Sequence, residues 1–212
     1  MTKLLLVRHG QSEANKLDLF AGFYDADLME LGLEQAASTA HYLFEHYKVD
    51  KVFSSDLKRA YKTAEMIAKQ FAVELTADAQ LREISGGEWE GLHFPSLKNW
   101  YPEAFGLWST DIGNAFCPGG ETVRQFADRI MSALERIAAE HDGMTVVIVT
   151  HATPIRVVHT MLTHKDIACM QQMPWVSNAS VTEIVRDETG WSMVKIGADE
   201  HLEGIRTALS GI

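Results

Sequence analysis

The stretch Leu4–Asn15, LLLVRHGQSEAN, places four consecutive aliphatic residues directly before an arginine, a histidine and a glycine. An apolar residue at every position is typical of a strand that helices cover on both faces, as in a parallel α/β sheet. Gly10 then breaks the pattern. Ligands of such sheets bind beyond the carboxyl ends of the strands, so Arg8 and His9 stand where a functional site is expected.

Two further strands repeat this arrangement. Residues 144–149 form a second apolar run, and His151 follows shortly after its end. Residues 52–53 form a shorter strand, and Arg59 opens the helix that comes after it. Because the carboxyl ends of neighbouring parallel strands meet at one edge of the sheet, the spacing predicts that these two histidines and two arginines converge.

Helical periodicity between the strands defines the fold class. Amphipathic helices are predicted over 31–47, 60–71, 123–137 and 154–162, with Ser54 or Ser55 as the cap of the second, and a weak strand over 73–75. Val181–Val185 and Trp191–Ile196, joined around Gly190, indicate an edge hairpin. The sequence therefore predicts a three-layer α/β/α sandwich with a mostly parallel central sheet and one antiparallel edge hairpin.

The chain is predicted to form a single domain over residues 1–212, interrupted by a lid-like insertion at about residues 86–120. This segment loses the helical period and is rich in aromatic residues: Trp89, Phe94, Trp100, Tyr101, Phe105, Trp108 and Phe116. Most of these rings are expected to form a small core, while one or two of them contact the ligand as well.

Composition narrows the classes of partner. A net charge of -10 argues against nucleic acid or an anionic membrane as the main partner, although a local basic pocket can still attract a small anion. Cys117 and Cys169 are too few for a disulfide framework, and no apolar run reaches the roughly 18 residues that span a bilayer. The sequence predicts a soluble protein of the cytoplasm.

The converging residues point to phosphoryl chemistry. Guanidinium groups present paired donors that match phosphate oxygens, and a flanking arginine disfavours the imidazolium, which keeps a histidine neutral and nucleophilic. His9 is the better nucleophile candidate because it lies deepest against a strand end. Taken singly, Arg59 also fits a solvated helix arginine, and His151 also fits a structural histidine at a strand end.

Metal and nucleotide signatures are missing from the sequence. The remaining histidines show neither HExxH nor Cys/His ligand spacing, so no metal site is predicted. The chain also lacks the glycine-rich loops G-x-x-x-x-G-K-[ST] and G-x-G-x-x-G, which lowers the case for nucleoside triphosphates and dinucleotides.

Five motifs in this order resemble one family, the histidine phosphatase superfamily, also called phosphoglycerate mutase-like. They are LLLVRHGQSEAN (4–15), FAGFYDADLMELGLEQA (20–36), VFSSDLKRAYKTA (52–64), LREISGGEWEGL (81–92) and VVIVTHATPIR (146–156). The resemblance implies the family's fold and a phosphate-transfer chemistry that needs neither a metal nor another cofactor.

The resemblance also implies roles for individual residues. His9 matches the phosphorylated histidine, Arg8 and Arg59 match the phosphate-binding arginines, and His151 matches the second histidine, which is both catalytic and phosphate-binding. Glu83 matches the general acid and base that serves the leaving oxygen.

Other positions are matched more loosely. Asn15 and Gln11 correspond to polar residues near the phosphate, and Glu90 is expected to support the site. The substrate pocket is expected to include Phe20, Ala21, Gly22, Trp100 and Trp108.

The chain departs from the family pattern at a few positions. Met29 stands where a threonine or serine usually caps the helix, so Asp27 is expected to take over the capping. Ala14 replaces a common tryptophan, and Ala152 replaces a common glycine after His151. These changes affect packing and pocket shape, and through them the choice of substrate.

The function expected from these features is hydrolysis of small-molecule phosphate monoesters through a phosphohistidine on His9. One alternative is a cofactor-dependent phosphoglycerate mutase, which would use 2,3-bisphosphoglycerate; the FAGFYDADL stretch favours it, whereas PGGET and the short chain favour a phosphatase. A second alternative is an inactive protein that binds a phosphorylated ligand. The expected partner is a small phosphorylated metabolite, and the sequence leaves the oligomeric state open.

Overall fold

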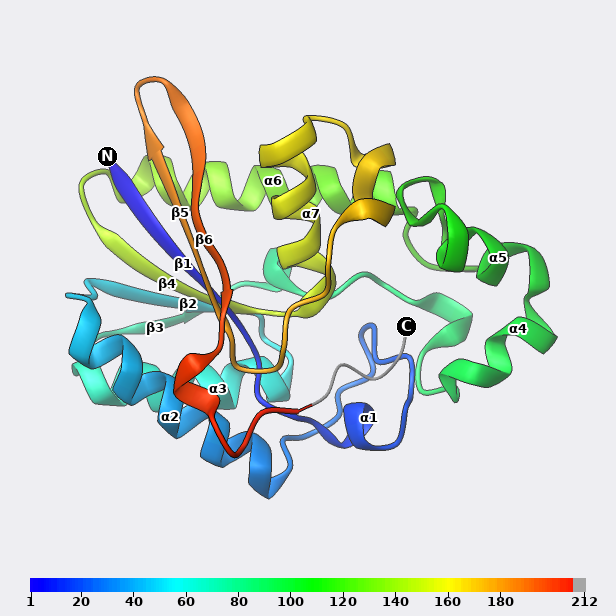
Figure 1. Cartoon of the computed structure of the whole chain (residues 1–212), viewed down its shortest axis with the longest axis horizontal. Coiled ribbons are helices and arrows are strands. Elements are labelled where there is room, and N and C mark those ends of the chain that lie inside the picture. Colours follow the sequence, from blue (N-terminus) through cyan, green and yellow to red (C-terminus); the bar gives the residue numbers. More distant parts are fainter. Residues whose placement is uncertain (208–212) are drawn as a thin grey trace.

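A six-stranded sheet lies between two layers of helices in the computed structural model, which describes residues 1–207 (Figure 1). The strands follow the order β3-β2-β4-β1-β5-β6 across the sheet. Their bounds are β1 (Thr2–Arg8), β2 (Lys51–Ser54), β3 (Leu75–Ala77), β4 (Thr145–Thr150), β5 (Val181–Asp187) and β6 (Gly190–Ala198). Strands β1 to β4 run parallel and β5 and β6 antiparallel, which confirms the predicted fold class.

The two central strands explain the apolar runs of the sequence. Leu4 and Leu6 of β1 face one apolar cluster with α6 and α7, while Leu5 and Val7 face another with α2 and α3. Their side chains are fully buried, as expected for strands covered on both sides. The helices in these layers are α2 (Glu30–His46), α3 (Lys58–Phe71), α6 (Val123–Glu140) and α7 (Ala152–His164).

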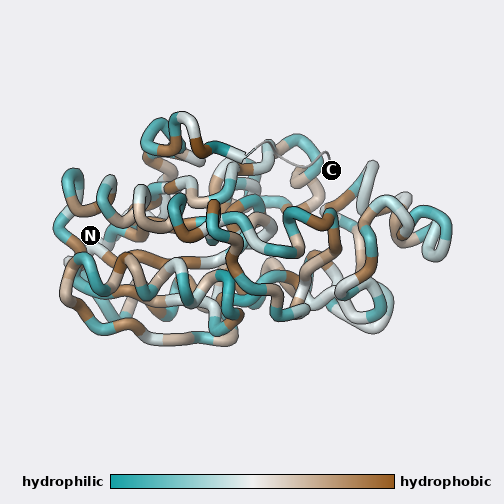
Figure 2. Tube along the Cα trace, turned by 90° about the horizontal axis from the view of Figure 1, so that it is seen from below, coloured by the Kyte–Doolittle hydropathy of each residue, from teal (hydrophilic) through white to brown (hydrophobic). Residues whose placement is uncertain are grey.

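Each covering helix buries only one of its faces. Figure 2 shows hydrophobic and hydrophilic residues alternating along the coiled segments of the chain. In α6 the buried positions recur at helical spacing, from Val123 through Phe126, Ile130 and Leu134 to Ile137. Thr122 caps this helix and forms a reciprocal capping box with Gln125.

The expected helix caps are wrong at two helices. Met29 precedes α2 without a side-chain cap, because the Asp27 carboxylate instead accepts from the Leu28 N–H and pairs with a lysine of α3. Helix α3 begins after Leu57, which also lacks a side-chain cap. Ser55 lies two residues before the cap position; its hydroxyl accepts from the N–H of Leu57 and also bonds to His151 at the strand edge.

Two glycines let the loop after β1 pack closely against the start of α2. A Cβ at Gly10 would lie 2.2 Å from the carbonyl oxygen of Gly32, and a Cβ at Gly32 would lie 2.1 Å from the carbonyl oxygen of Gln11. Both distances are shorter than any real contact, so neither position accommodates a side chain. The loop that carries His9 therefore rests directly on helix α2.

The insertion consists of short helices that pack on the main core. They are η2 (Gly87–Trp89), η3 (Phe94–Ser96), α4 (Leu97–Trp100), α5 (Pro102–Thr110) and η4 (Ile112–Asn114). Trp89 and Trp108 are buried and meet edge to face, with ring centroids 5.8 Å apart. They belong to the same apolar cluster as Leu4 and Leu6 of β1, so the insertion shares the core of the sheet.

The remaining elements are short and differ from the sequence prediction in detail. Helix α1 (Glu13–Lys16) follows the β1 loop, and η1 (Ala79–Leu81), η5 (Ile167–Gln172) and η6 (Glu200–Leu202) connect longer elements. The third parallel strand spans residues 75–77, two residues later than predicted. Within residues 1–207, none of the helices has the length and apolar character needed to cross a membrane.

Candidate active site

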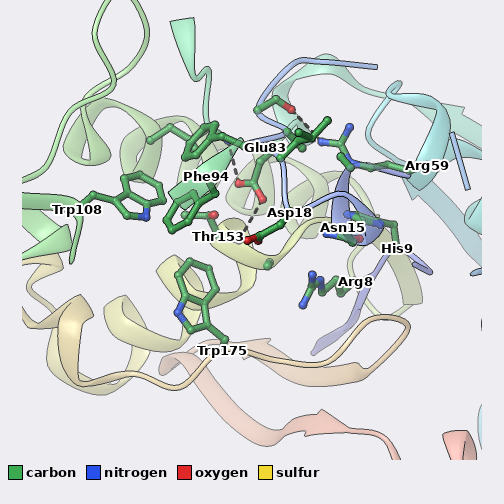
Figure 3. Close-up of a pocket in the computed structure, with 17 residues that line it drawn as sticks. Arg8, His9, Asn15, Asp18, Arg59, Glu83, Phe94, Trp108, Thr153 and Trp175 are labelled. Carbon is green, nitrogen blue, oxygen red and sulfur yellow. Dashed lines mark hydrogen bonds between the residues drawn. The ribbon is translucent and has the colours of Figure 1, made fainter. Parts of the chain in front are cut away.

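A cavity opens at the carboxyl ends of β1 and β4, at the edge where the apolar strands give way to polar residues. Arg8 and Thr150 are paired in the register of these two strands, so the histidines that follow, His9 and His151, are neighbours. Their rings lie 5.2 Å apart between centroids. Figure 3 shows Arg8, His9, Arg59 and Glu83 around this cavity.

One ring nitrogen of His9 forms a hydrogen bond with the protein, and the other faces no hydrogen-bond partner among residues 1–207. Its Nδ1 lies 2.6 Å from the carbonyl oxygen of Gly10, which can only accept a hydrogen bond, so Nδ1 carries the proton and Nε2 carries the lone pair. Burial, Arg59 and Arg8 together hold the pKa of His9 well below its ordinary value. The ring is therefore neutral at pH 7, with an unprotonated nitrogen.

His151 stands at the start of α7 and is fully buried. Its Nε2 lies 2.9 Å from the hydroxyl of Ser55, which follows β2. Burial, Arg59, His9 and Arg8 lower the pKa of His151 well below its ordinary value. The hydroxyl fixes the ring beside the first histidine, and a bound dianion at this point would favour its protonation.

The two arginines are aimed by backbone carbonyls. Arg8 donates from NH1 to the carbonyl oxygen of Val176 at 2.6 Å, and Arg59 donates to those of Tyr24 and Gly22 at 2.9 and 2.8 Å. Neither guanidinium pairs with a carboxylate within residues 1–207. Two buried positive charges without an ion-pair partner create a strong preference for an anion.

Both arginines stay charged despite their burial. Burial is the main cause that lowers the pKa of Arg8 and that of Arg59 to about 10, and the nearby carboxylate of Glu83 opposes this shift in each case. A pKa of about 10 leaves the guanidinium protonated at neutral pH. Two cations and two neutral imidazoles therefore meet at the same strand edge. Arg8, His9 and Arg59 line the cavity itself, whereas His151 is not among the lining residues and lies buried behind His9.

Glu83 faces the cavity from the segment after β3. Its two carboxylate oxygens accept hydrogen bonds from the N–H groups of Ile84 at 2.9 Å and Thr153 at 3.3 Å. Burial raises the pKa of Glu83, against the opposing effect of those N–H groups and Arg59. A carboxyl group with a raised pKa can give a proton at mildly acidic to neutral pH.

The main chain around Glu83 is fixed by residues from two other elements. Arg129 of α6 donates to the carbonyl oxygens of Glu83 and Arg82 at 3.0 and 3.1 Å, and it pairs with Glu121. Thr150, at the end of β4, donates to the carbonyl oxygen of Leu81 at 2.7 Å. These bonds tie the general acid candidate to the strand edge that carries the histidines.

Of the polar positions expected near the phosphate, one lines the cavity. Asn15 lies on the wall and accepts a hydrogen bond from Asn178 at 3.1 Å; the same Asn178 amide donates to the carbonyl oxygen of His9. Gln11 is not among the lining residues, and its N–H donates to Gln35 of α2 instead. Glu90 accepts from the Gly86 N–H at 2.9 Å and so supports the loop.

Four of the five residues predicted for the substrate pocket lie on the cavity wall, and Trp100 does not. Phe20, Ala21, Gly22 and Trp108 line the cavity. Trp100 is 61% exposed, because α4 packs on the core through Leu97 and turns its last residue outward.

Several lining residues were not singled out from the sequence. They are Ala14, Asp18, Leu19, Ile84, Ala152, Thr153 and Trp175; Phe94, which also lines the cavity, was predicted only as one of the aromatic rings of the insertion. Ala14 and Ala152 were noted only as departures from the family pattern. Trp175 comes from the loop before β5, far from every motif, and its position depends on tertiary packing against Arg156, whose guanidinium lies 4.3 Å from the ring centroid. Asp18 lies two residues after the end of α1, and no motif of the sequence points to it.

The chain matches the family model of the histidine phosphatase superfamily (branch 1) over residues 4–199. It is 34% identical over 207 residues to a metal-independent phosphoserine phosphatase of Arabidopsis thaliana, covering 97% of this chain and 85% of that protein. It is 33% identical over 202 residues to phosphoserine phosphatase 1 of Hydrogenobacter thermophilus, covering 95% of each.

The fold also matches solved structures of the same group. A mycobacterial glucosyl-3-phosphoglycerate phosphatase, solved in complex with VO3, superimposes with a TM-score of 0.84 at 27% identity over 92% of this chain and 99% of that one. The match between family model, relatives and fold extends over nearly the whole chain. The chain therefore belongs to the histidine phosphatase superfamily and is a phosphoric monoester hydrolase of that family.

Proposed function

We propose that the protein hydrolyses small phosphate monoesters in two steps, with a phosphohistidine on His9 as the intermediate. One observation supports this most strongly: a neutral imidazole with a free Nε2 shares a cavity with two arginines that no described carboxylate neutralises. Such a cavity binds a dianionic phosphoryl group and presents a nucleophile to it.

In the first step, Nε2 of His9 attacks phosphorus while the bond from phosphorus to the ester oxygen breaks. Arg8, Arg59 and His151 hold the equatorial oxygens, where charge is spread in the transition state. Glu83, protonated because of its raised pKa, gives its proton to the leaving oxygen. The products of this step are a free alcohol, an ionised Glu83 and a phosphorylated His9.

In the second step, the ionised carboxylate of Glu83 takes a proton from water, and the resulting hydroxide attacks phosphorus. The bond from phosphorus to Nε2 of His9 breaks and releases inorganic phosphate. Glu83 is thereby reprotonated and His9 recovers its lone pair, so both groups return to their starting states. The carboxyl group of Glu83 therefore serves as the general acid in the first step and as the general base in the second.

We propose that no metal takes part and that the protein acts in the cytoplasm. The two arginines supply the positive charge that the transferred group needs, and a relative is named a metal-independent phosphoserine phosphatase. Both cysteines, Cys117 and Cys169, are free thiols, which is compatible with a reducing compartment.

The activity is tested by phosphate release from a chromogenic phosphate monoester. The wild-type protein is expected to turn it over, and His9→Ala to lose at least about a thousandfold in kcat, because the nucleophile is gone. A surface variant, Glu13→Gln on the exposed face of α1, serves as the matched control and should retain turnover. Equal turnover by the wild type and His9→Ala would contradict the assigned nucleophile.

Hydrolysis is distinguished from mutase activity with 3-phosphoglycerate. A mutase must keep water out and hold a bisphosphate while it turns around, whereas relatives of this chain are named phosphatases. We expect any reaction with 3-phosphoglycerate to release inorganic phosphate, with or without added 2,3-bisphosphoglycerate. Formation of 2-phosphoglycerate at a higher rate than phosphate release would favour the mutase.

A further inference from the structure

We propose that Asp18 selects phosphate esters whose leaving group carries an ammonium group, as in the phosphates of amino alcohols. This inference rests on the proposed function, which places the phosphate beside His9 and the leaving group in the rest of the cavity. It adds a determinant of substrate choice that the phosphoryl chemistry itself does not require.

Asp18 is part of the cavity wall but not of the phosphate cradle. It lines the cavity together with Asn15, Glu83 and Thr153, and Figure 3 shows it among these labelled residues. Its side chain is half-buried, and its carboxylate has neither a hydrogen bond nor an ion pair from residues 1–207. A partly enclosed carboxylate without a counter-charge is a position for a cationic ligand.

Backbone contacts with the insertion hold the loop that carries the Asp18 carboxylate. Asp18 has a φ of 51°, a left-handed conformation that aspartate and asparagine adopt more often than most other residues with a side chain. Its carbonyl oxygen accepts a 2.8 Å bond from the Phe94 N–H, and the next residue, Leu19, forms a bridge with His93. The insertion therefore fixes the loop that presents Asp18 to the cavity.

The charges of the cavity leave Asp18 without compensation during the reaction. A phosphate dianion balances the two arginines, and Glu83 must be protonated to act as an acid. Among the described lining residues, Asp18 is the one carboxylate besides that of the proposed acid. An ammonium group there is attracted to it, while a carboxylate on the leaving group is repelled.

Aromatic rings complete the surroundings expected for an ammonium group. Phe20, Phe94 and Trp108 line the same cavity and form a connected cluster, with the rings of Phe20 and Trp108 meeting edge to face at 5.2 Å. A cation over such rings gains electrostatic attraction in addition to its pairing with a carboxylate. The fourth aromatic ring of the wall, Trp175, already carries the guanidinium of Arg156.

The test uses three esters of matched size that differ in the charge of the leaving group. They are O-phosphoethanolamine with an ammonium, 2-hydroxyethyl phosphate with a neutral hydroxyl, and phosphoglycolate with a carboxylate. We expect the wild-type kcat/KM to be about tenfold higher for the first than for the second, equivalent to about 1.4 kcal/mol, and lowest for the third.

The decisive variant is Asp18→Asn, which removes the charge and keeps the shape. Asparagine tolerates the left-handed conformation, so the loop is expected to fold. The ratio of kcat/KM between the ammonium and hydroxyl esters should fall to within about twofold in this variant. Comparing ratios between proteins cancels the intrinsic reactivity of each ester. Glu13→Gln, which removes an exposed charge outside the cavity, should leave the ratio at its wild-type value.

A binding measurement separates this inference from the proposed function. His9→Ala takes up an ester without turning it over, and calorimetry is expected to show about tenfold tighter binding of O-phosphoethanolamine than of 2-hydroxyethyl phosphate. The double variant His9→Ala with Asp18→Asn should lose that difference. Hydrolysis of neutral esters without a preference for the ammonium would overturn only the role of Asp18. Binding preference without any hydrolysis would overturn only the proposed function.

Discussion

At His9, burial and the two neighbouring arginines all disfavour protonation of the imidazole. They hold the pKa of the imidazole well below its ordinary value, while burial moves the pKa of Glu83 upward. These opposite directions favour a deprotonated nucleophile and a protonated acid, although both groups share one cavity. Opposite displacements of two neighbouring pKa values are the usual means of assigning acid and base roles.

These shifts fix the sign of the pH dependence. Reaction requires neutral His9 and protonated Glu83, so kcat/KM should persist on the acid side below pH about 6.5 and fall as pH rises through the raised pKa of Glu83. Steady-state rates between about pH 4 and 9 with an alkyl phosphate test this. An optimum on the mildly acidic to neutral side is expected, and a rate that rises steadily to pH 9 would contradict the assignment.

Replacement of the acid should separate the two chemical steps. In Glu83→Gln an alkyl ester lacks its proton donor, so kcat should fall by about a hundredfold or more. An aryl ester such as 4-nitrophenyl phosphate needs no proton, so it should still phosphorylate His9 and give a burst of nitrophenolate, followed by slow turnover. Rapid-mixing absorbance measurements detect this burst. Equal losses for both esters without a burst would refute the role of Glu83.

The positions of the proposed reacting residues can be predicted from the sequence, whereas those of most residues around them cannot. Arg8, His9 and His151 follow apolar strands directly, so the geometry of a parallel sheet alone brings them to one edge. Asp18 and Trp175 lack such a rule, because their positions depend on a left-handed loop residue and on packing against Arg156. The same holds for Gln11, which motif matching alone assigned to the phosphate and which does not line the cavity.

At the scale of elements, the contact between the β1 loop and α2 carries the strictest packing requirement. Gly32→Ala would bring a Cβ to 2.1 Å from the Gln11 carbonyl oxygen, so the loop bearing His9 must shift. We expect a loss of about 3 kcal/mol in unfolding free energy, together with a marked loss of kcat. Denaturant unfolding and steady-state rates measure the two effects.

A second glycine provides the control for that substitution. Gly106 lies in α5, and a Cβ added there would meet nothing within 4 Å. Gly106→Ala should stabilise the protein by about 0.5 to 1 kcal/mol through helix propensity, without loss of activity. Similar destabilisation by both substitutions would mean that the close approach of the β1 loop to α2 does not matter.

Element types follow from the sequence, whereas element ends do not. The apolar runs and helical stripes predict every long helix and strand of the sandwich, because burial on one or two faces imposes a fixed period. The predicted caps at Ser54, Ser55 and Asp27 fail because these side chains bond to other groups. Asp27 pairs with Lys62, and the Ser54 hydroxyl donates to the carbonyl oxygen of Ser55. The Ser55 hydroxyl bonds to His151 and accepts from the N–H of Leu57, which lies before the helix. Local capping rules cannot anticipate such long-range partners.

At the scale of the whole molecule, an acidic protein encloses a basic cavity. The net charge is -10, yet the two arginines of the cavity lack a carboxylate partner among the described residues. Selectivity for a small anion therefore arises from the cavity and not from the surface, which repels polyanions. This arrangement suits a substrate small enough to enter between the sheet edge and the insertion.

Chelation tests whether those protein charges suffice for catalysis. Dialysis against EDTA should leave kcat with a phosphate monoester within about twofold of the untreated value, because the two guanidinium groups supply the positive charge. The control is re-addition of magnesium, manganese or zinc in separate samples. A loss of about tenfold or more that one of these ions restores would show that the proposal of metal independence is wrong.

The phosphohistidine on His9 is tested most directly by identifying which side chain carries the phosphoryl group during turnover. The wild-type protein is mixed with a phosphate monoester, quenched with alkali to preserve a phosphoramidate, digested and examined by tandem mass spectrometry. The account predicts a mass increase of one phosphoryl group on the peptide that contains His9, localised to that imidazole and missing from His9→Ala. Phosphorus on any other side chain, or release of phosphate with no phosphorylated His9 under rapid quenching, would contradict it.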